Sequence, residues 1–555
     1  MQRKTGWIVG VALAVLASGC VAPQVVGPAS AGAAADAAEP DCYAVVNGIN
    51  LHHATIADLQ AALTAGTITS VQLVDAYVAR VAAYDNGGPL LNSIQEISAS
   101  AHAQALALDQ ERAAGRVRGP LHGMPILLKD NVGTVDEPTT AGALSLAGNV
   151  PPQDATLTER LRAAGAIILG KTQLSEFANW VSLTMPNGYS SLGGQVYNAY
   201  TGGDPSGSSA GSGVAGSMAF SAATIGTETS GSILSPSNAN SLVGVKPTVG
   251  LVSRAGVIPL AANFDTPGPM VRNVADAALV LGAIAGPDPR DPATAESAGH
   301  LPANNDYAAL LRTDALQGVR LGYEANANAI FQTALYDLEA QGATLVEIDD
   351  HDLDTISLLE IGLIPNEFKF GLNQYLATEA GPGLPVHDLT AIVLYNLDHP
   401  DEYAYGQDLL IASDLTPGLG PLADATALPV IAANRLLADK LFEDNDVDAL
   451  IGLNAPWTGL GAAAGYPTVT VPAGYAGVDP RGLSFFGPRW SEAALLGYAF
   501  AYEQASHRRV APTDISDWLL EGVCDGGAAA PSAADATPTQ RAQGPRAIPG
   551  GRPSA

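Results

Sequence analysis

Hydrophobic residues follow two alternating patterns along this chain. Some stretches repeat apolar residues at helical spacing, and the short unbroken apolar runs between them are typical of strands buried in a sheet. The stretches with helical spacing are residues 55–65, 70–84, 98–114, 156–164, 274–285, 307–311 and 329–341. The strand-like runs are residues 124–128, 166–169, 220–225, 319–323 and 343–348. No segment repeats at a fixed period and no linker interrupts the body of the chain, so we predict one large α/β domain.

The N-terminal segment has the features of an export signal. Arg3 and Lys4 give it a basic start, and the apolar run from Trp7 to Ala17 is too short to span a membrane stably. Residues 16–20, Leu-Ala-Ser-Gly-Cys, resemble a bacterial lipobox, with alanine where a larger aliphatic residue is usual. We therefore expect residues 1–20 to be a signal peptide or a lipoprotein signal. The pattern leaves both free secretion and a lipid anchor at Cys20 open.

The segments next to both ends lack a pattern that could pack. Residues 21–41 are rich in Ala, Gly and Pro and are expected to form a flexible tether, and residues 525–555 are expected to be a disordered tail. The folded domain is then residues 42–524. Its two cysteines, Cys42 and Cys524, lie one near each end. Disulfides persist outside the cytoplasm, so we predict that the two pair, the alternative being two unpaired cysteines.

Composition excludes one class of partner and draws attention to the lysines. A formal net charge of −29, from 55 acidic and 26 basic residues, opposes binding to a phosphate backbone, so no nucleic-acid partner is expected. Membrane contact is expected only through the possible anchor at Cys20. Lysine is scarce, and Lys129 and Lys171 are the two that stand in apolar surroundings.

Two glycine-rich motifs suggest nucleotides without the context that nucleotide binding needs. Residues 165–172 match the phosphate-loop pattern G-x4-G-K-[ST], but a helix precedes them and their apolar middle is itself strand-like. Residues 211–216 match G-x-G-x-x-G, but no strand precedes them. We therefore expect no nucleotide at either motif.

A third motif gives a rival catalytic reading. Residues 207–211 fit G-x-S-x-G, in which the central Ser209 would be the nucleophile of an α/β-hydrolase. Such an enzyme needs a downstream histidine. The candidates all lie in polar or loop-like surroundings, and none stands out as a base: His300, His351, His387, His399 and His507.

The turn after the apolar run 220–225 offers a better nucleophile. Ser232 follows Gly231 in the segment Gly-Thr-Glu-Thr-Ser-Gly-Ser-Ile, residues 226–233. Glycine lets the backbone approach a substrate closely. The successive N–H groups of Thr229, Ser230, Gly231 and Ser232 can form an anion-binding nest, which a tetrahedral oxyanion requires.

A base for this serine could come from Lys129, at the end of the apolar run 124–128. Burial disfavours the ammonium form, and a lysine whose pKa falls from about 10.4 to about 7 becomes a usable base. The alternative is a structural ion pair between Lys129 and Asp130 or another acid.

Taken together, these segments resemble the amidase signature family. The resemblance covers about residues 55–508 and continues in residues 243–248, 250–254, 265–270, 465–467 and 471–472. It implies a central twisted mixed β-sheet covered by helices on both sides. It also implies a metal-free, cofactor-free triad of Ser232 as nucleophile, Ser208 as a bridging serine after a cis peptide bond, and Lys129 as base.

The same resemblance assigns supporting roles. Backbone N–H groups of Thr229, Ser230 and Gly231 would form the oxyanion hole, although Ser230 departs from the glycine usual there. Ser209 would support the hydrogen bonds, or simply cap a helix. Lys171 and Arg254 match recurring family positions and are best interpreted as structural.

Further segments resemble the bacterial peptide amidase branch, which releases ammonia from C-terminal peptide amides. They are residues 367–373, 406–407, 490–492 and 502–505, whereas residues 454–457 depart from the usual sequence. We therefore expect an exported serine amidohydrolase of a bacterial cell envelope. The alternatives are an aryl or aliphatic amide or ester hydrolase with the same triad, a tethered binding protein without turnover, and, least in keeping with export, a component of a transamidosome.

Overall fold

The computed structural model describes residues 41–348, 354–418 and 420–524. The predicted export signal, the lipobox cysteine, nearly all of the tether, the tail and His351 lie outside the described residues, and those statements stay predictions. Among the described residues no helix is long and apolar enough to cross a membrane.

Eleven strands form one mixed β-sheet. In sheet order they are β12 (Thr344–Glu347), β11 (Arg320–Tyr323), β13 (Ala449–Leu453), β15 (Asp479–Phe486), β14 (Thr468–Ala476), β9 (Val243–Lys246), β10 (Thr266–Val271), β8 (Ala223–Glu228), β4 (Pro125–Lys129), β5 (Ile167–Thr172) and β3 (Ile94–Ile97). β4 is parallel to β5 and β8, and β11 is parallel to β12 and β13, while the other pairs are antiparallel. Two short hairpins, β1 (Val45–Val46) with β2 (Ile49–Asn50) and β6 (Tyr189–Ser190) with β7 (Gly194–Gln195), lie outside this sheet.

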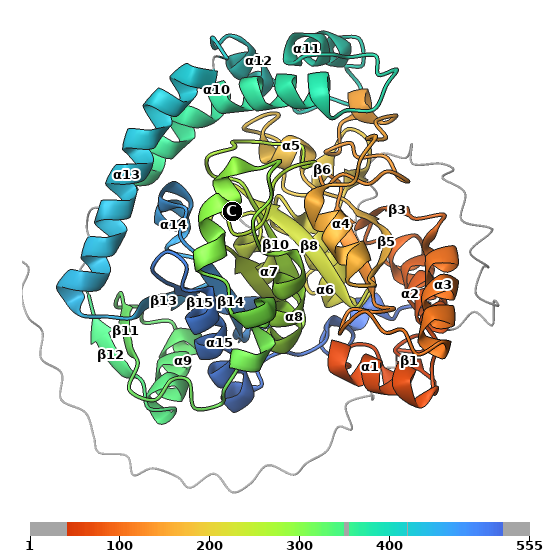
Figure 1. Ribbon diagram of the computed structural model, residues 1–555, viewed down its shortest axis with the longest axis vertical. Helices are drawn as coiled ribbons and strands as arrows, with labels where there is room; N and C mark the ends of the chain where they lie inside the picture. Colours follow the sequence, from red (N-terminus) through yellow and green to blue (C-terminus); the bar gives the residue numbers. More distant parts are fainter. Residues whose placement is uncertain (1–40, 349–353, 419, 525–555) are drawn as a thin grey trace, which may run out of the picture. The chain divides into compact units, whose positions relative to one another are not determined.

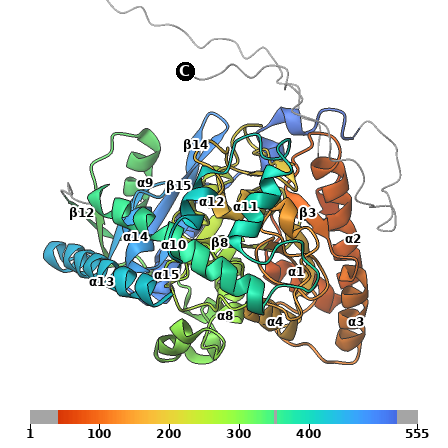
Figure 2. The ribbon, with the colours of Figure 1, turned by 90° about the horizontal axis from the view of Figure 1, so that it is seen from above.

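Helices cover the sheet on both sides, as Figures 1 and 2 show. They are α1 (Ile56–Ala65), α2 (Ser70–Arg80), α3 (Ala101–Ala113), α4 (Thr156–Ala163), α5 (Glu176–Asn179), α6 (Ala210–Ser217), α7 (Leu234–Ala239), α8 (Val274–Ile284), α9 (Ala329–Ala340), α10 (Asp354–Thr378), α11 (Leu389–Leu397), α12 (Asp408–Asp414), α13 (Gly420–Asn445), α14 (Thr458–Ala464) and α15 (Glu492–Ser506). The α/β domain with a central mixed sheet is thereby confirmed.

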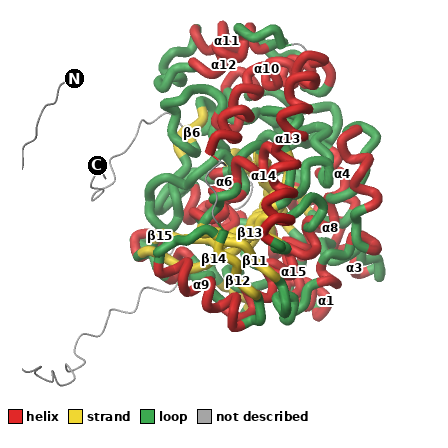
Figure 3. Tube along the Cα trace, turned by 90° about the vertical axis from the view of Figure 1, so that its left-hand side faces the viewer, coloured by secondary structure: helices red, strands yellow, loops and turns green. Residues whose placement is uncertain are grey.

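Most predicted elements are present, with ends shifted by a few residues. The predicted helix at residues 307–311 is wrong: the chain forms only a 3-10 turn at Ala308–Leu310, because the backbone of Leu311 is already extended. The sequence did not predict the helical region α10–α13, of which α13 lies beside α14 in Figure 3. Its two longest helices contain Pro365 and Pro429, and an interior proline normally signals the end of a helix.

Small residues on one face of the sheet let α7 lie close to it. A β-carbon at Gly226 would lie 3.2 Å from Ile233, and one at Gly268 would lie 3.1 Å from the same side chain. Val243 and Val245, which alternate with Gly244 along β9, pack into the main hydrophobic core instead. The glycines therefore bring the turn before α7 down onto the strand ends.

Candidate active site

Lys129 ends β4, which lies in the sheet between β5 and β8. Its side chain is fully buried. The ammonium nitrogen Nζ lies 2.8 Å from Ser208 Oγ and donates a second hydrogen bond to the Thr227 carbonyl oxygen at 3.1 Å. No carboxylate lies within ion-pair distance of Lys129 among the residues that the structure describes. The amine is thus held by neutral oxygens.

These surroundings lower the pKa of Lys129 to about 7, because burial penalises the charged form. The carboxylates of Asp265 and Glu228 oppose this shift through their negative charge. A lysine with such a pKa is partly neutral at neutral pH and can accept a proton. Perturbation of this kind marks candidate functional groups.

Ser208 follows a cis peptide bond from Gly207. Its carbonyl oxygen accepts a hydrogen bond from the Ser175 N–H at 3.0 Å, and the side chain is buried against Lys129. The next residue, Ser209, donates its hydroxyl to the Thr227 carbonyl at 3.1 Å and accepts from the Thr227 N–H at 3.3 Å. Ser209 therefore ties the segment carrying Ser208 to the end of β8.

Ser232 lies in the turn between β8 and α7. Its carbonyl oxygen accepts from the Ser209 N–H at 3.3 Å, which joins the two serine segments directly. Ser232 retains 7% of its surface exposed, and its hydroxyl has no hydrogen-bond partner within the described part of the chain. Gly231, with φ of 80°, supplies the left-handed conformation that the turn needs.

The backbone of this turn is open to an anion. Among the residues that the structure describes, the N–H groups of residues 229–232 have no acceptor. Such unpaired donors in one turn suit the oxygen of a tetrahedral intermediate. The structure thus brings together Lys129, Ser208, Ser232 and the expected oxyanion donors, within one hydrogen-bonded neighbourhood.

Two carboxylates hold this turn, and sequence reasoning gave neither a role. Glu228 Oε2 accepts the N–H groups of Ile233 and Leu234 at 2.7 and 2.9 Å. Asp265 Oδ1 accepts the Thr229 hydroxyl at 2.6 Å. Burial raises the pKa of Asp265. The signal that could have found them is an acidic residue inside an otherwise apolar or glycine-rich motif.

Lys171 has a different environment from Lys129. Its ammonium donates to the Val132 and Pro138 carbonyls and to the Thr139 hydroxyl, and it lies 3.8 Å from Asp130. Burial lowers the pKa of Lys171 and raises that of Asp130 to about 6. Asp130 therefore pairs with Lys171 and not with Lys129.

The two nucleotide-type motifs and the G-x-S-x-G motif lie in elements that do not suit the functions they suggest. Residues 167–172 of the phosphate-loop match are β5, fully buried, and residues 211–216 lie inside α6. The Ser209 hydroxyl bonds only to the backbone of Thr227 within the described residues, and no histidine meets it. Arg254 forms a paired contact with Asp291, at 2.8 and 2.6 Å.

Comparison with known proteins places the chain among the amidases. The Amidase family model matches residues 72–392. The chain is 37% identical over 483 residues to a probable amidase of Arabidopsis thaliana, covering 84% of this chain and 93% of that protein. It is 31% identical over 491 residues to one component of the glutamyl-tRNA(Gln) amidotransferase of a Synechococcus strain, covering 81% and 96%.

Among solved structures, the peptide amidase of Stenotrophomonas maltophilia matches with a TM-score of 0.78 and 40% identity, over 83% of this chain and 98% of that one. An amidase family protein of Bacillus anthracis matches with a TM-score of 0.77 and 35% identity, over 83% and 92%. The chain belongs to the amidase signature family of serine amidases, hydrolases that act on carbon–nitrogen bonds, and within it resembles the peptide amidase branch.

Proposed function

We propose that this protein hydrolyses C-terminal peptide amides and releases ammonia, with Ser232 as nucleophile, Ser208 as proton relay and Lys129 as base. The observation that carries the proposal is the 2.8 Å contact between a lysine of lowered pKa and Ser208, whose segment is joined to Ser232 by the hydrogen bond from the Ser209 N–H to the Ser232 carbonyl. Neutral Lys129 takes the Ser208 proton while Ser208 takes the proton of Ser232.

In the first half-reaction, Ser232 Oγ attacks the carboxamide carbon. The carbonyl oxygen becomes an oxyanion, which the N–H groups of residues 229–232 stabilise. When the tetrahedral intermediate collapses, the proton returns from Lys129 through Ser208 to the leaving nitrogen. Ammonia departs and the peptide acyl group remains esterified to Ser232.

In the second half-reaction, water attacks the acyl-enzyme. The relay of Ser208 and Lys129 takes one proton from this water as it adds to the carbonyl carbon. The second tetrahedral intermediate then expels Ser232 Oγ, which regains the proton, and the peptide leaves with a free carboxyl group. Water thus supplies the oxygen of the new carboxyl group and the proton that restores Ser232, which balances the cycle.

The peptide-amide substrate is supported by similarity to the Stenotrophomonas maltophilia peptide amidase and to a peptide amidase complex with the competitive inhibitor chymostatin, at 40% identity each. An aryl amide or ester could also acylate Ser232, because the proposed triad makes no contact that selects the leaving group. The substrate panel must therefore contain all three classes.

The test is release of ammonia from blocked peptide amides by the purified domain at pH 8, beside matched aryl amides and esters. Ser232→Ala and Lys129→Ala should each lower kcat by at least about 10³-fold. Lys171→Met is the matched control, because it removes a buried lysine that lies outside the triad. Full activity of Ser232→Ala would refute the mechanism, and hydrolysis of the aryl amides without release of ammonia from any peptide amide would refute the substrate.

We also propose that the protein is exported. The basic and apolar start of the chain supports this, and so does the Cys42–Cys524 disulfide, since such bonds persist in oxidising compartments. Fractionation of a bacterium expressing the full chain and Cys20→Ser separates the two routes. Loss of membrane association in Cys20→Ser indicates a lipid anchor, unchanged secretion indicates release, and a cytoplasmic product contradicts export.

A further inference from the structure

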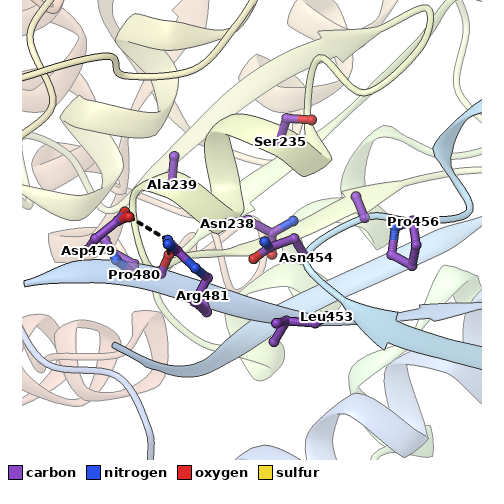
Figure 4. Close-up of a pocket in the computed structure, with 10 residues that line it drawn as sticks. Ser235, Asn238, Ala239, Leu453, Asn454, Pro456, Asp479, Pro480 and Arg481 are labelled. Atoms are coloured by element: carbon purple, nitrogen blue, oxygen red, sulfur yellow. Dashed lines mark hydrogen bonds and ion pairs between the residues drawn. The ribbon is translucent and has the colours of Figure 1, made fainter. Parts of the chain in front are cut away.

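A cavity of about 450 Å³ lies between α7 and the turns at the ends of β13 and β15. Figure 4 shows Ser235, Asn238 and Ala239 of α7 on one side, with Asn454, Asp479 and Arg481 among the residues opposite. None of these residues belongs to the proposed triad or the oxyanion turn. The proposed chemistry therefore leaves this cavity without an assigned occupant.

The cavity adjoins the oxyanion turn through α7. The Ser235 N–H donates to the Gly231 carbonyl at 2.8 Å, and a β-carbon at Gly231 would lie 3.1 Å from Ser235 Oγ. Ser235 is thus both a wall of the cavity and a neighbour of the turn. From Ser235 to Ala239 the helix rises about 6 Å, roughly the length of two extended residues.

Asn238 places an unsatisfied polar group in the cavity wall. Its side chain is buried, with 5% of the residue exposed, and Oδ1 accepts a hydrogen bond from the Thr470 hydroxyl at 2.6 Å. Its amide nitrogen Nδ2 has no hydrogen-bond partner in the described part of the chain. A buried amide left unpaired costs free energy, so a ligand oxygen that accepts from it gains affinity.

Other donors surround the same space. The Ser235 hydroxyl has no hydrogen-bond partner within the described residues. Arg481 contacts Asp479 at 2.7 Å and the Pro480 carbonyl at 2.8 Å, both through Nη1, which leaves Nη2 for a ligand. Because the arginine and the aspartate cancel in charge, the lining favours a neutral group rich in carbonyl oxygens over a free anion.

We propose that this cavity is the subsite for the two residues upstream of the scissile carboxamide residue, and that Asn238, Ser235 and Arg481 bind their backbone carbonyls. The inference rests on the proposed function. In a peptide amide the leaving group is ammonia, so the rest of the substrate extends on the acyl side. A chain leaving Ser232 along α7 passes Ser235 first and reaches Arg481 afterwards.

The test uses acetylated alanine amides of one, two and three residues. The ratio of kcat/KM for the three-residue amide to that for the one-residue amide should be about tenfold or more in the wild type. Arg481→Met, which removes donors, and Ala239→Leu, which fills the cavity, should each bring this ratio close to one. Arg312→Met is the matched control, because Arg312 also pairs with an aspartate two residues away at 2.7 Å, outside the cavity.

Binding provides a readout that does not need turnover. In Ser232→Ala, calorimetric titration with the same three amides should show affinity rising with length, and addition of Arg481→Met should remove the rise. Equal affinities for all three amides, or an unchanged ratio in both cavity variants, overturn the subsite. If the wild type hydrolyses none of the amides while binding still rises with length, the proposed function fails, and what stands is that the cavity binds the peptide backbone.

Discussion

Two buried lysines of this chain show how surroundings decide the chemistry of one residue type. Lys171 has three oxygen acceptors and the carboxylate of Asp130 at 3.8 Å. Lys129 has a hydroxyl and one carbonyl as its acceptors. Burial penalises both ammonium groups, but only Lys129 donates to Ser208, the proton relay of the proposed mechanism. The same sequence feature, a lysine in an apolar strand, therefore has two outcomes.

The lowered pKa of Lys129 predicts the pH dependence of turnover. Below a pKa of about 7 the lysine is protonated and cannot act as base, and above it the neutral amine is available. We expect kcat/KM for a peptide amide to rise about tenfold per pH unit below 7 and to level off above it. Steady-state rates between pH 5 and 9 give the midpoint. A rate that still rises tenfold per pH unit up to pH 9 would contradict the assignment, because it would place the midpoint nearer the ordinary lysine pKa of 10.5.

Asp265 provides the control for this profile. Its negative charge raises the pKa of Lys129 against the effect of burial. Asp265→Asn removes the charge and retains an acceptor for the Thr229 hydroxyl, so the midpoint should move to lower pH. A midpoint that moves upward or stays in place would show that the profile belongs to another group.

At the scale of elements, the turn between β8 and α7 depends on Glu228. Its carboxylate accepts the N–H groups of Ile233 and Leu234, which would otherwise be unpaired at the start of α7. We predict that Glu228→Ala lowers kcat at least tenfold and the free energy of unfolding by about 1–3 kcal/mol, whereas Glu228→Gln, which keeps an acceptor, loses less of both. Rates and urea unfolding measure the two effects. Equal losses in the two variants would exclude a positioning role.

Helices and strands were predictable where residues close together in the sequence determine them. β4 is an apolar run that ends at Lys129, and α1 has a threonine cap and a glycine end, so their sequences define them. The helices α10 and α13 break the local rule because each contains a proline and is held by long-range packing. The cavity beside α7 is another non-local feature, since its walls are separated by more than 200 residues.

At the scale of the whole molecule, the order and pairing of the strands bring the residues of the candidate site together. The parallel pairing of β4 with β8 brings Lys129 beside the strand that leads to Ser232, and the loop before α6 carries Ser208 between them. Motifs and spacing gave the residue types, and resemblance gave their roles. Their distances, and the carboxylates Glu228 and Asp265 that hold the turn, required the fold.

The Cys42–Cys524 disulfide is the last connection at this scale. Its Cα atoms are 6.0 Å apart although 482 residues separate them in sequence. Nearby, Asp41 accepts from Arg80 at 3.0 Å and from Tyr84 at 2.6 Å, and Thr513 lies 3.2 Å from His52. Both ends of the folded chain therefore meet around the end of α2, and the disulfide closes this contact.

We predict that Cys42→Ser destabilises the protein by about 2–4 kcal/mol, because a crosslink over a long loop restricts the unfolded chain. Amidase activity at 25 °C should be unchanged, since neither cysteine contacts the triad. The measurement is the apparent unfolding temperature at a fixed scan rate, with limited proteolysis at residues 41–54 and 511–524. Reductant should lower the wild type to the level of Cys42→Ser and leave the variant unaffected. An equal effect of reductant on both would mean that the bond does not join the chain ends in solution.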